Sequence, residues 1–160
     1  MYVSHTISSP VGKLQLVAGV HSLRAVLWEG EDGSRIKLGA CVEDADHPVL
    51  RETEKQLNEY FAGTRKVFDL PLDLAGTDLQ KRVWMQLLQI PYGATQTYSQ
   101  LAAQIGAPAA VRAVGAANGR NPVSIIIPCH RLVGSNGGLT GFAGGLDNKR
   151  WLLELEAGRL

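Results

Sequence analysis

The sequence is poor in cysteine and has no long apolar run. Its 160 residues contain two cysteines, Cys41 and Cys129, and neither belongs to a Cys-x-x-Cys pair. A disulfide scaffold or a zinc site is therefore not expected, and we predict no metal and no cofactor. The longest strongly apolar segment, residues 123–127, is far too short to cross a bilayer, and the amino terminus lacks a basic stretch leading into an apolar one. We expect a soluble cytoplasmic protein with no membrane partner, in which both thiols stay reduced.

Acidic residues are missing from a long part of the second half. Residues 1–77 hold 8 Lys and Arg against 11 Asp and Glu, whereas residues 78–160 hold 8 against 4. No Asp or Glu occurs between positions 79 and 146, a stretch that contains Lys81, Arg82, Arg112, Arg120 and Arg131. Because a carboxylate near a phosphate cancels the gain from a lysine, this pattern favours a surface that faces a polyanion. Chance combined with a buried core is the alternative explanation.

The first half predicts a small α+β domain. Three segments alternate or are β-branched and are separated by turn residues, as in a three-stranded antiparallel meander: residues 2–8, 13–18 and 23–28. After a polar, acidic loop that contains Cys41, residues 47–61 carry apolar side chains at helical spacing. Residues 68–74 add a last extended segment. Ala75-Gly76 is the most plausible boundary, so we predict domains at 1–75 and 76–160.

The second half is expected to be mostly helical. Thr77 is placed to cap a helix through Ile90, and Thr97 with Gln100 has the capping-box pattern for a helix at 98–105. A turn and a further helix at 109–117 complete a helix-turn-helix arrangement. Residues 123–127 predict a buried extended segment. A glycine-rich loop at 134–145 and a last helix capped by Asp147 follow.

The helix at 109–117 has an unusual composition. Arg112 is its one long polar side chain among small residues. A helix with small residues on its exposed face can approach another surface closely, and the arginine then projects beyond that face. A helix buried in a core is the alternative, which Arg112 opposes because an unpaired guanidinium is costly to desolvate.

Cys129 is the candidate nucleophile. It follows the apolar segment and precedes His130 and Arg131, and neighbouring cations or a base favour the thiolate. Adjacent side chains of a strand point to opposite sides, so contact between Cys129 and His130 needs a bend or a bridging water. Glu154 and Glu156 are the candidates for a carboxylate that orients the histidine, with Glu156 slightly favoured by its spacing from Leu152. The alternative is that both are solvated surface charges. Cys41 is assigned no role.

Several motifs together carry a resemblance to a known family. They are Arg112-Ala113-Val114-Gly115, Asn121-Pro122, Pro128-Cys129-His130-Arg131, Gly144-Gly145 and Trp151-Leu152-Leu153. In this order the chain resembles the O6-alkylguanine-DNA alkyltransferases, densely from about residue 76 to residue 157. Ser9-Pro10-Val11-Gly12 and Tyr60-Phe61-Ala62-Gly63 extend the likeness to the family's bacterial members.

The resemblance implies a fold and a reaction. It implies an amino-terminal ribonuclease H-like domain, a winged-helix-like DNA-binding domain, and repair of double-stranded DNA that contains O6-alkylguanine. Cys129 then accepts the alkyl group once and irreversibly, His130 takes its proton through water, Glu156 orients His130, and Asn121 holds the turn before the active site. We expect a monomer in solution, with cooperative assembly on DNA and activity on O4-alkylthymine left open.

The resemblance also implies the DNA-facing residues. Arg112 fills the space left by an extruded nucleotide, Tyr98 promotes its rotation, and Ser135 touches the lesion. The remaining DNA-facing positions are Ala113, Gly115, Arg131, Phe142 and Gly144. Many relatives carry tyrosine in place of Phe142, so its phenolic hydrogen bond is absent here. Lys149 is linked to the active-site network.

Three other functions fit the sequence less well. A lesion-binding relative without transfer would lack the acceptor cysteine, which Cys129 supplies. A cysteine hydrolase would need an oxyanion hole that the sequence does not show. A helix-turn-helix regulator is disfavoured because residues 109–117 offer almost no side chains that read bases.

Overall fold

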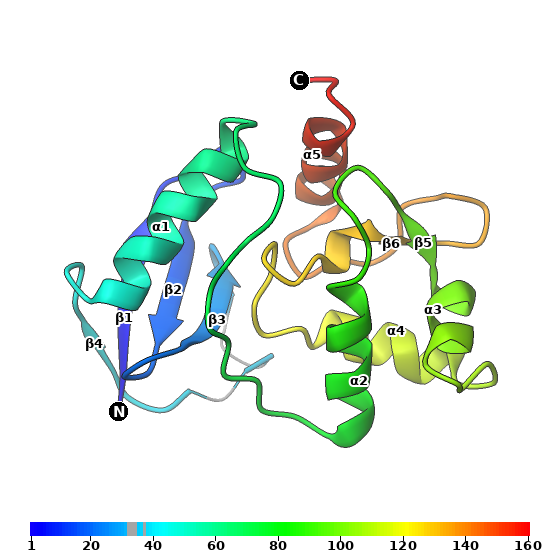
Figure 1. Ribbon diagram of the computed structural model, residues 1–160, viewed down its shortest axis with the longest axis horizontal. Helices are drawn as coiled ribbons and strands as arrows, with labels where there is room; N and C mark the ends of the chain where they lie inside the picture. The colour runs from blue at the N-terminus through cyan, green and yellow to red at the C-terminus, as the bar shows by residue number, and fades with distance from the viewer. Residues whose placement is uncertain (32–34, 37) are drawn as a thin grey trace. The chain divides into compact units, whose positions relative to one another are not determined.

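The chain divides into two compact units, Met1–Leu74 and Ala75–Leu160 (Figure 1). The structure is a computed structural model that describes residues 1–31, 35–36 and 38–160. The first unit is built on a sheet with one long helix, and the second is mostly helical. The α+β class predicted from the sequence is confirmed. None of the helices in the described ranges is long and apolar enough to cross a membrane.

The sheet of the first unit has the strand order β3-β2-β1-β4. It consists of β1 (Tyr2–Ile7), β2 (Leu14–Ala18), β3 (Leu23–Trp28) and β4 (Cys41–Glu43). The first three strands are antiparallel neighbours, as expected, while β4 runs parallel to β1 with Cys41 opposite Tyr2. The predicted three-stranded sheet therefore has a fourth strand, in a segment predicted to be a loop. Three residues are too few to show a strand pattern, but they pair with the free edge of β1.

Helix α1 (Pro48–Phe61) contributes Leu50, Leu57 and Tyr60 to the core of this unit. Its first turn is capped by His47, whose Nδ1 accepts from the backbone N–H of Val49 at 3.3 Å. The expected extended segment at 68–74 forms only an isolated bridge, between Leu72 and Leu23.

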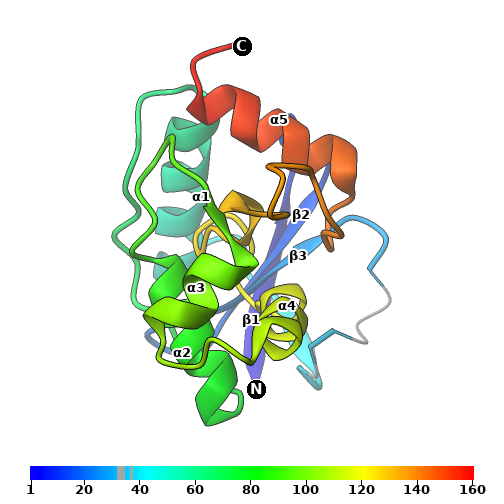
Figure 2. The same cartoon turned by 90° about the vertical axis from the view of Figure 1, so that its right-hand side faces the viewer.

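Four helices form most of the second unit: α2 (Asp78–Leu87), α3 (Tyr98–Gln104), α4 (Val111–Gly119) and α5 (Leu146–Glu156). Thr77 and Thr97 both cap their helices in full capping boxes. Helix α2 packs on α4 through Trp84, whose indole N–H donates to the carbonyl oxygen of Ala117 at 2.8 Å. Helices α3 and α4 lie next to each other (Figure 2). Between them Gly106 adopts a φ of +76°, which favours glycine.

Two helix boundaries in this unit differ from those expected from the sequence. Helix α2 ends at Leu87 rather than Ile90, because the chain tightens into turns before Pro91. Gly145 stands at the N-cap of α5 with a φ of +88°, and Asp147 lies inside the first turn.

Residues 123–127 are buried, as expected, but they are not extended. They form a tight turn with a bridge between Ser124 and Ile127, and Ile125 has a φ of +74°. The side chain of Asn121 holds this turn: its Oδ1 accepts from Val123 N–H at 3.0 Å and its Nδ2 donates to the Ile127 carbonyl at 2.8 Å. The turn leads directly into Cys129. After Cys129 the chain enters β6 (Leu132–Val133), which pairs in parallel with β5 (Gln96–Thr97).

Candidate active site

Cys129 begins a single turn of 3₁₀-helix, Cys129–Arg131, and is 4% exposed. Its own N–H donates to the Ile127 carbonyl at 2.8 Å, and the N–H of Arg131 donates to the Pro128 carbonyl at 3.0 Å. The chain therefore bends at the cysteine. The strand geometry that would have kept Cys129 and His130 on opposite sides is absent.

His130 is completely buried and pairs with Glu156 on α5. Its Nε2 lies 2.7 Å from Oε2 of Glu156, so Nε2 carries a proton and donates it to the carboxylate. In the neutral ring Nδ1 is then an acceptor, and it is buried with no hydrogen-bond partner in the described part of the chain. Burial lowers the pKa of His130, and the hydrogen bond to Glu156 only partly opposes this. The pair thus presents a neutral base next to Cys129.

Arg131 is the second partner of Glu156. Its Nε donates to Oε1 at 2.8 Å and its Nη2 to Oε2 at 3.0 Å, while Nη1 donates to the Ile90 carbonyl at 2.7 Å. Burial alone raises the pKa of Glu156, but hydrogen bonds from His130 and Arg131 outweigh it and lower that pKa to about 2. Glu156 is therefore an anion that fixes the histidine ring.

The placement of Arg131 corrects an expectation. We predicted that it faces DNA, but it is 7% exposed and its guanidinium is occupied by protein groups. A buried carboxylate needs a counter-charge, and Arg131 supplies it to Glu156.

Lys149 and Tyr98 both contact residues of the segment that follows Cys129, between positions 132 and 140. The ammonium group of Lys149 donates to the carbonyl oxygens of Leu132, at 2.7 Å, and Thr140, at 3.4 Å. Burial lowers the pKa of Lys149, and the neighbouring Cys129 opposes the shift. The phenol oxygen of Tyr98 lies 2.5 Å from the hydroxyl oxygen of Thr140. Phe142 is half-buried, with the Lys149 ammonium 5.9 Å from its ring centre.

The other expected DNA-facing residues lie nearer the surface. Arg112 is exposed on α4, and Ala113 is half-buried beside it. Gly115 lies against Tyr98, because a Cβ added there would sit 3.8 Å from the tyrosine ring. Ser135 is exposed in the glycine-rich loop, and the half-buried Gly144 accepts a hydrogen bond from Asn148 through its carbonyl.

Comparison with known proteins identifies the two units. Residues 2–74 match the ribonuclease-like domain of the 6-O-methylguanine DNA methyltransferases, and residues 78–158 match the DNA-binding domain of the same proteins. The chain belongs to the 6-O-methylguanine DNA methyltransferase family.

Relatives in this family cover nearly the whole chain. A methylated-DNA–protein-cysteine methyltransferase of Mycobacterium tuberculosis is 49% identical over 156 residues, which are 96% of this chain and 92% of the relative. One from Methanosarcina barkeri is 47% identical over 156 residues, 96% of each protein. A crystal structure of Mycobacterium tuberculosis OGT in complex with DNA has a TM-score of 0.88 and 48% identity, covering 99% of this chain and 93% of that one.

Two residues of the site in this methyltransferase were not predicted from the sequence, Asn118 and Thr140. Asn118 donates to the Cys129 carbonyl at 3.4 Å, and Thr140 contacts both Tyr98 and Lys149. The signal for Asn118 in the sequence was an amide side chain at the end of a helix of small residues. Thr140 carried no signal, since a hydroxyl in a glycine-rich loop is common.

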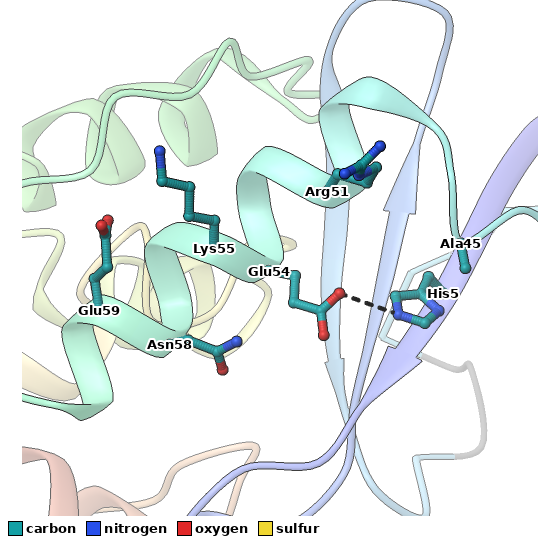
Figure 3. Close-up of a pocket in the computed structure, with 7 residues that line it drawn as sticks. All are labelled: His5, Ala45, Arg51, Glu54, Lys55, Asn58 and Glu59. Carbon is teal, nitrogen blue, oxygen red and sulfur yellow. Dashed lines mark ion pairs between the residues drawn. The ribbon is translucent and has the colours of Figure 1, made fainter.

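A hollow in the first unit has no comparable chemistry. It has a volume of about 520 Å³ and is lined by His5, Ala45, Arg51, Glu54, Lys55, Asn58 and Glu59 (Figure 3). His5 lies between two carboxylates, with Nδ1 3.2 Å from Glu43 and Nε2 3.3 Å from Glu54. Positive and negative side chains both line the hollow, so it favours neither an anionic nor a cationic ligand.

Proposed function

We propose that Cys129 is the residue that accepts the alkyl group. The activity of the family, and of this chain, is repair of O6-methylguanine in DNA by transfer of the methyl group to a cysteine of the protein itself. One observation carries the assignment to Cys129: its neighbour His130 is held by Glu156 in the tautomer whose other ring nitrogen accepts a proton. Cys41, the other cysteine, lies in the first unit on β4.

The hydrogen-bonded network of His130, Arg131 and Glu156 explains how the thiol of Cys129 becomes a nucleophile. The proton of Cys129 passes through a water molecule to Nδ1 of His130, leaving a thiolate and an imidazolium that Glu156 stabilises. Arg131 keeps Glu156 ionised and fixed in orientation, so the ring does not rotate when it gains charge. The Asn121 turn fixes the backbone on which the thiol stands.

The transfer is then a single displacement. The sulfur forms a bond to the alkyl carbon while the bond from that carbon to O6 breaks, and the electron pair leaves with guanine. The guanine anion takes up one proton, so over the whole reaction the thiol proton replaces the alkyl group. The thioether on Cys129 is a poor leaving group, and the network contains no group that cleaves it. Each molecule therefore acts once.

Burial of the thiol implies that the substrate comes to it. Cys129 is 4% exposed, so an alkyl group inside a base stack cannot reach the sulfur. The nucleotide must be flipped out of double-stranded DNA, at a cost of a few kcal/mol. We propose that α4 lies in the minor groove, where its small residues allow close approach, and that Arg112 fills the space left in the stack.

The other DNA contacts are proposed from their places around Cys129. Tyr98 promotes rotation of the nucleotide and contacts the guanine, with Ala113 and Gly115 on the adjoining helix. Phe142 packs on the base through its ring alone. Ser135 and Gly144 contact the lesion strand from the glycine-rich loop. Support for a DNA partner comes from the relative crystallised with DNA and from the acid-free stretch.

We also propose that the protein acts as a monomer in the cytoplasm. Neither Cys41 nor Cys129 forms a disulfide, and reducing conditions keep Cys129 available as a thiol.

Intact-mass measurement tests the assignment of Cys129. The protein is mixed with a duplex that carries one O6-methylguanine, and we expect a gain of one methylene per protein molecule. Cys129→Ser should abolish the gain and Cys41→Ser should leave it unchanged. A gain that persists in Cys129→Ser would show that another residue is the acceptor.

A further inference from the structure

Asn118 connects α4 to the backbone of Cys129. It stands one residue before the end of the helix that carries Arg112, and it is 4% exposed. Its Nδ2 donates to the Cys129 carbonyl at 3.4 Å. Because a carbonyl can only accept, this contact fixes the orientation of the amide, with the NH₂ group toward Cys129 and Oδ1 turned away.

Two buried acceptors near Cys129 have no partner within the part of the chain that the structure describes. One is Oδ1 of Asn118 and the other is Nδ1 of His130. An unpaired buried acceptor costs about 1 to 3 kcal/mol, so each of these two acceptors calls for a donor.

The amide is also out of place in its helix. The other buried side chains of α4 are Val114 and Ala117, and leucine would fill the volume of Asn118 without burying a polar group. The Cys129 carbonyl accounts for the NH₂ end of this amide, and Oδ1 still needs a donor.

A water molecule matches both acceptors. It has two O–H donors, one for each acceptor, and a lone pair that can accept the S–H of Cys129. We propose that Asn118 is a positioning residue, whose Oδ1 and the Nδ1 of His130 together hold the water that takes the proton from Cys129. This inference rests on the proposed role of Cys129 as acceptor.

The proton balance follows from this arrangement. The water gives one proton to Nδ1 and receives the thiol proton, while its second hydrogen stays directed at Oδ1. The products are a thiolate, an imidazolium and an intact water molecule. Asn118 gains and loses nothing, and its contribution is to keep the water on the line between sulfur and nitrogen.

The test compares Asn118→Leu with its parent in a Cys41→Ser background, so that Cys129 is the only thiol. Iodoacetamide alkylates a thiol without any base or DNA, and its rate is followed by intact mass from acidic to alkaline pH. We expect Asn118→Leu to react about tenfold more slowly near neutral pH, the value of one hydrogen bond, and at the parent rate in alkali, where no relay is needed. Repair of a methylated duplex should slow by the same factor at unchanged affinity for DNA.

Two further variants make the outcome decisive. Asn118→Ala cannot overpack, keeps a good helix former in α4, and should show the same pH-dependent loss. Gln56→Leu is the matched control, because it removes a buried amide in the first unit whose two ends bond to the backbone of Asp69. It should lower stability and leave both rates unchanged.

Other results would overturn the proposal. Slower repair with an unchanged iodoacetamide profile would mean that Oδ1 contacts the guanine rather than the water. An equal loss at every pH would mean a structural role only. If the parent gains no methyl group on Cys129 while the iodoacetamide profile still shifts, the proposed acceptor is wrong and the relay stands.

Discussion

The phenol oxygen of Tyr98 and the hydroxyl oxygen of Thr140 lie 2.5 Å apart, so the start of α3 is joined to the glycine-rich loop. The carbonyl of Thr140 also accepts from Lys149, whose ammonium group reaches the Leu132 carbonyl. A chain of hydrogen bonds thus runs from the proposed nucleotide-rotating tyrosine to the segment of Cys129.

This chain predicts that Thr140 sets the orientation of Tyr98. Thr140→Val keeps the shape and removes the hydroxyl, and we expect it to slow repair of a methylated duplex about fivefold to tenfold. Tyr98→Phe should cost a similar amount, and the double variant should cost no more than either single one. Thr140→Ser restores the hydroxyl and should recover most of the rate. Single-turnover kinetics measure all four, and additive losses would contradict the coupling.

Removing Arg131 should destabilise the second unit strongly. Arg131→Met leaves the buried Glu156 carboxylate without its counter-charge, which costs about 3 to 5 kcal/mol in the free energy of unfolding. Urea denaturation measures the loss. Arg150→Met is the control, because its ion pair with Asp147 is long, at 3.6 Å, and largely exposed. It should change stability by less than about 0.5 kcal/mol.

Stability should fall in acid through Glu156. Its pKa is lowered from 4.5 to about 2 in the folded protein, so the unfolded chain binds a proton first as the pH falls. The stabilisation, on the order of 3 kcal/mol, is complete above pH 4.5 and is lost progressively toward pH 2. Glu156→Gln should be less stable at neutral pH and should show a flatter pH dependence over this window. Glu154→Gln removes a carboxylate from the same helix and is the control; equal slopes in both variants would refute the assignment.

Arg112 should matter for DNA and not for the thiol. Arg112→Ala should weaken binding to a lesion duplex and slow its repair by at least about tenfold, because the flipped state loses its support. The rate with free O6-alkylguanine base, which needs no flipping, should stay close to that of the parent. Arg150→Ala removes an exposed cation from α5 and controls for net charge. An equal loss of rate with the duplex and with the free base would show instead that Arg112 acts in the transfer step itself.

Asn121 should be required for the turn that precedes Cys129. Asn121→Ala leaves the N–H of Val123 unpaired in a buried site and removes one of the two donors to the Ile127 carbonyl, which keeps the N–H of Cys129, at about 1 to 3 kcal/mol. Asn121→Asp keeps the acceptor for Val123 and should lose less. Thermal unfolding ranks the three proteins, and equal midpoints would show that the turn holds without this side chain.

Local interactions explain what the sequence alone determined. The capping boxes at Thr77 and Thr97, and the apolar spacing of α1, predicted helices that the structure contains, because each depends on residues within a few positions of one another. The ordered motifs around Cys129 likewise indicated the family, since motif residues are read directly from the chain.

Long-range contacts explain what only the tertiary structure decided. Arg131 was expected to face DNA because it is a cation in an acid-free stretch, and it turned inward because Glu156, 25 residues later, is buried and needs a counter-charge. Residues 123–127 were predicted to be extended. They form a turn instead, because the side chain of Asn121 makes hydrogen bonds to the backbone of Val123 and Ile127. The contact of Asn118 with the Cys129 carbonyl depends on where α4 packs. In each case the deciding free energy is that of burying a charged or polar group, which depends on partners that sequence spacing does not reveal.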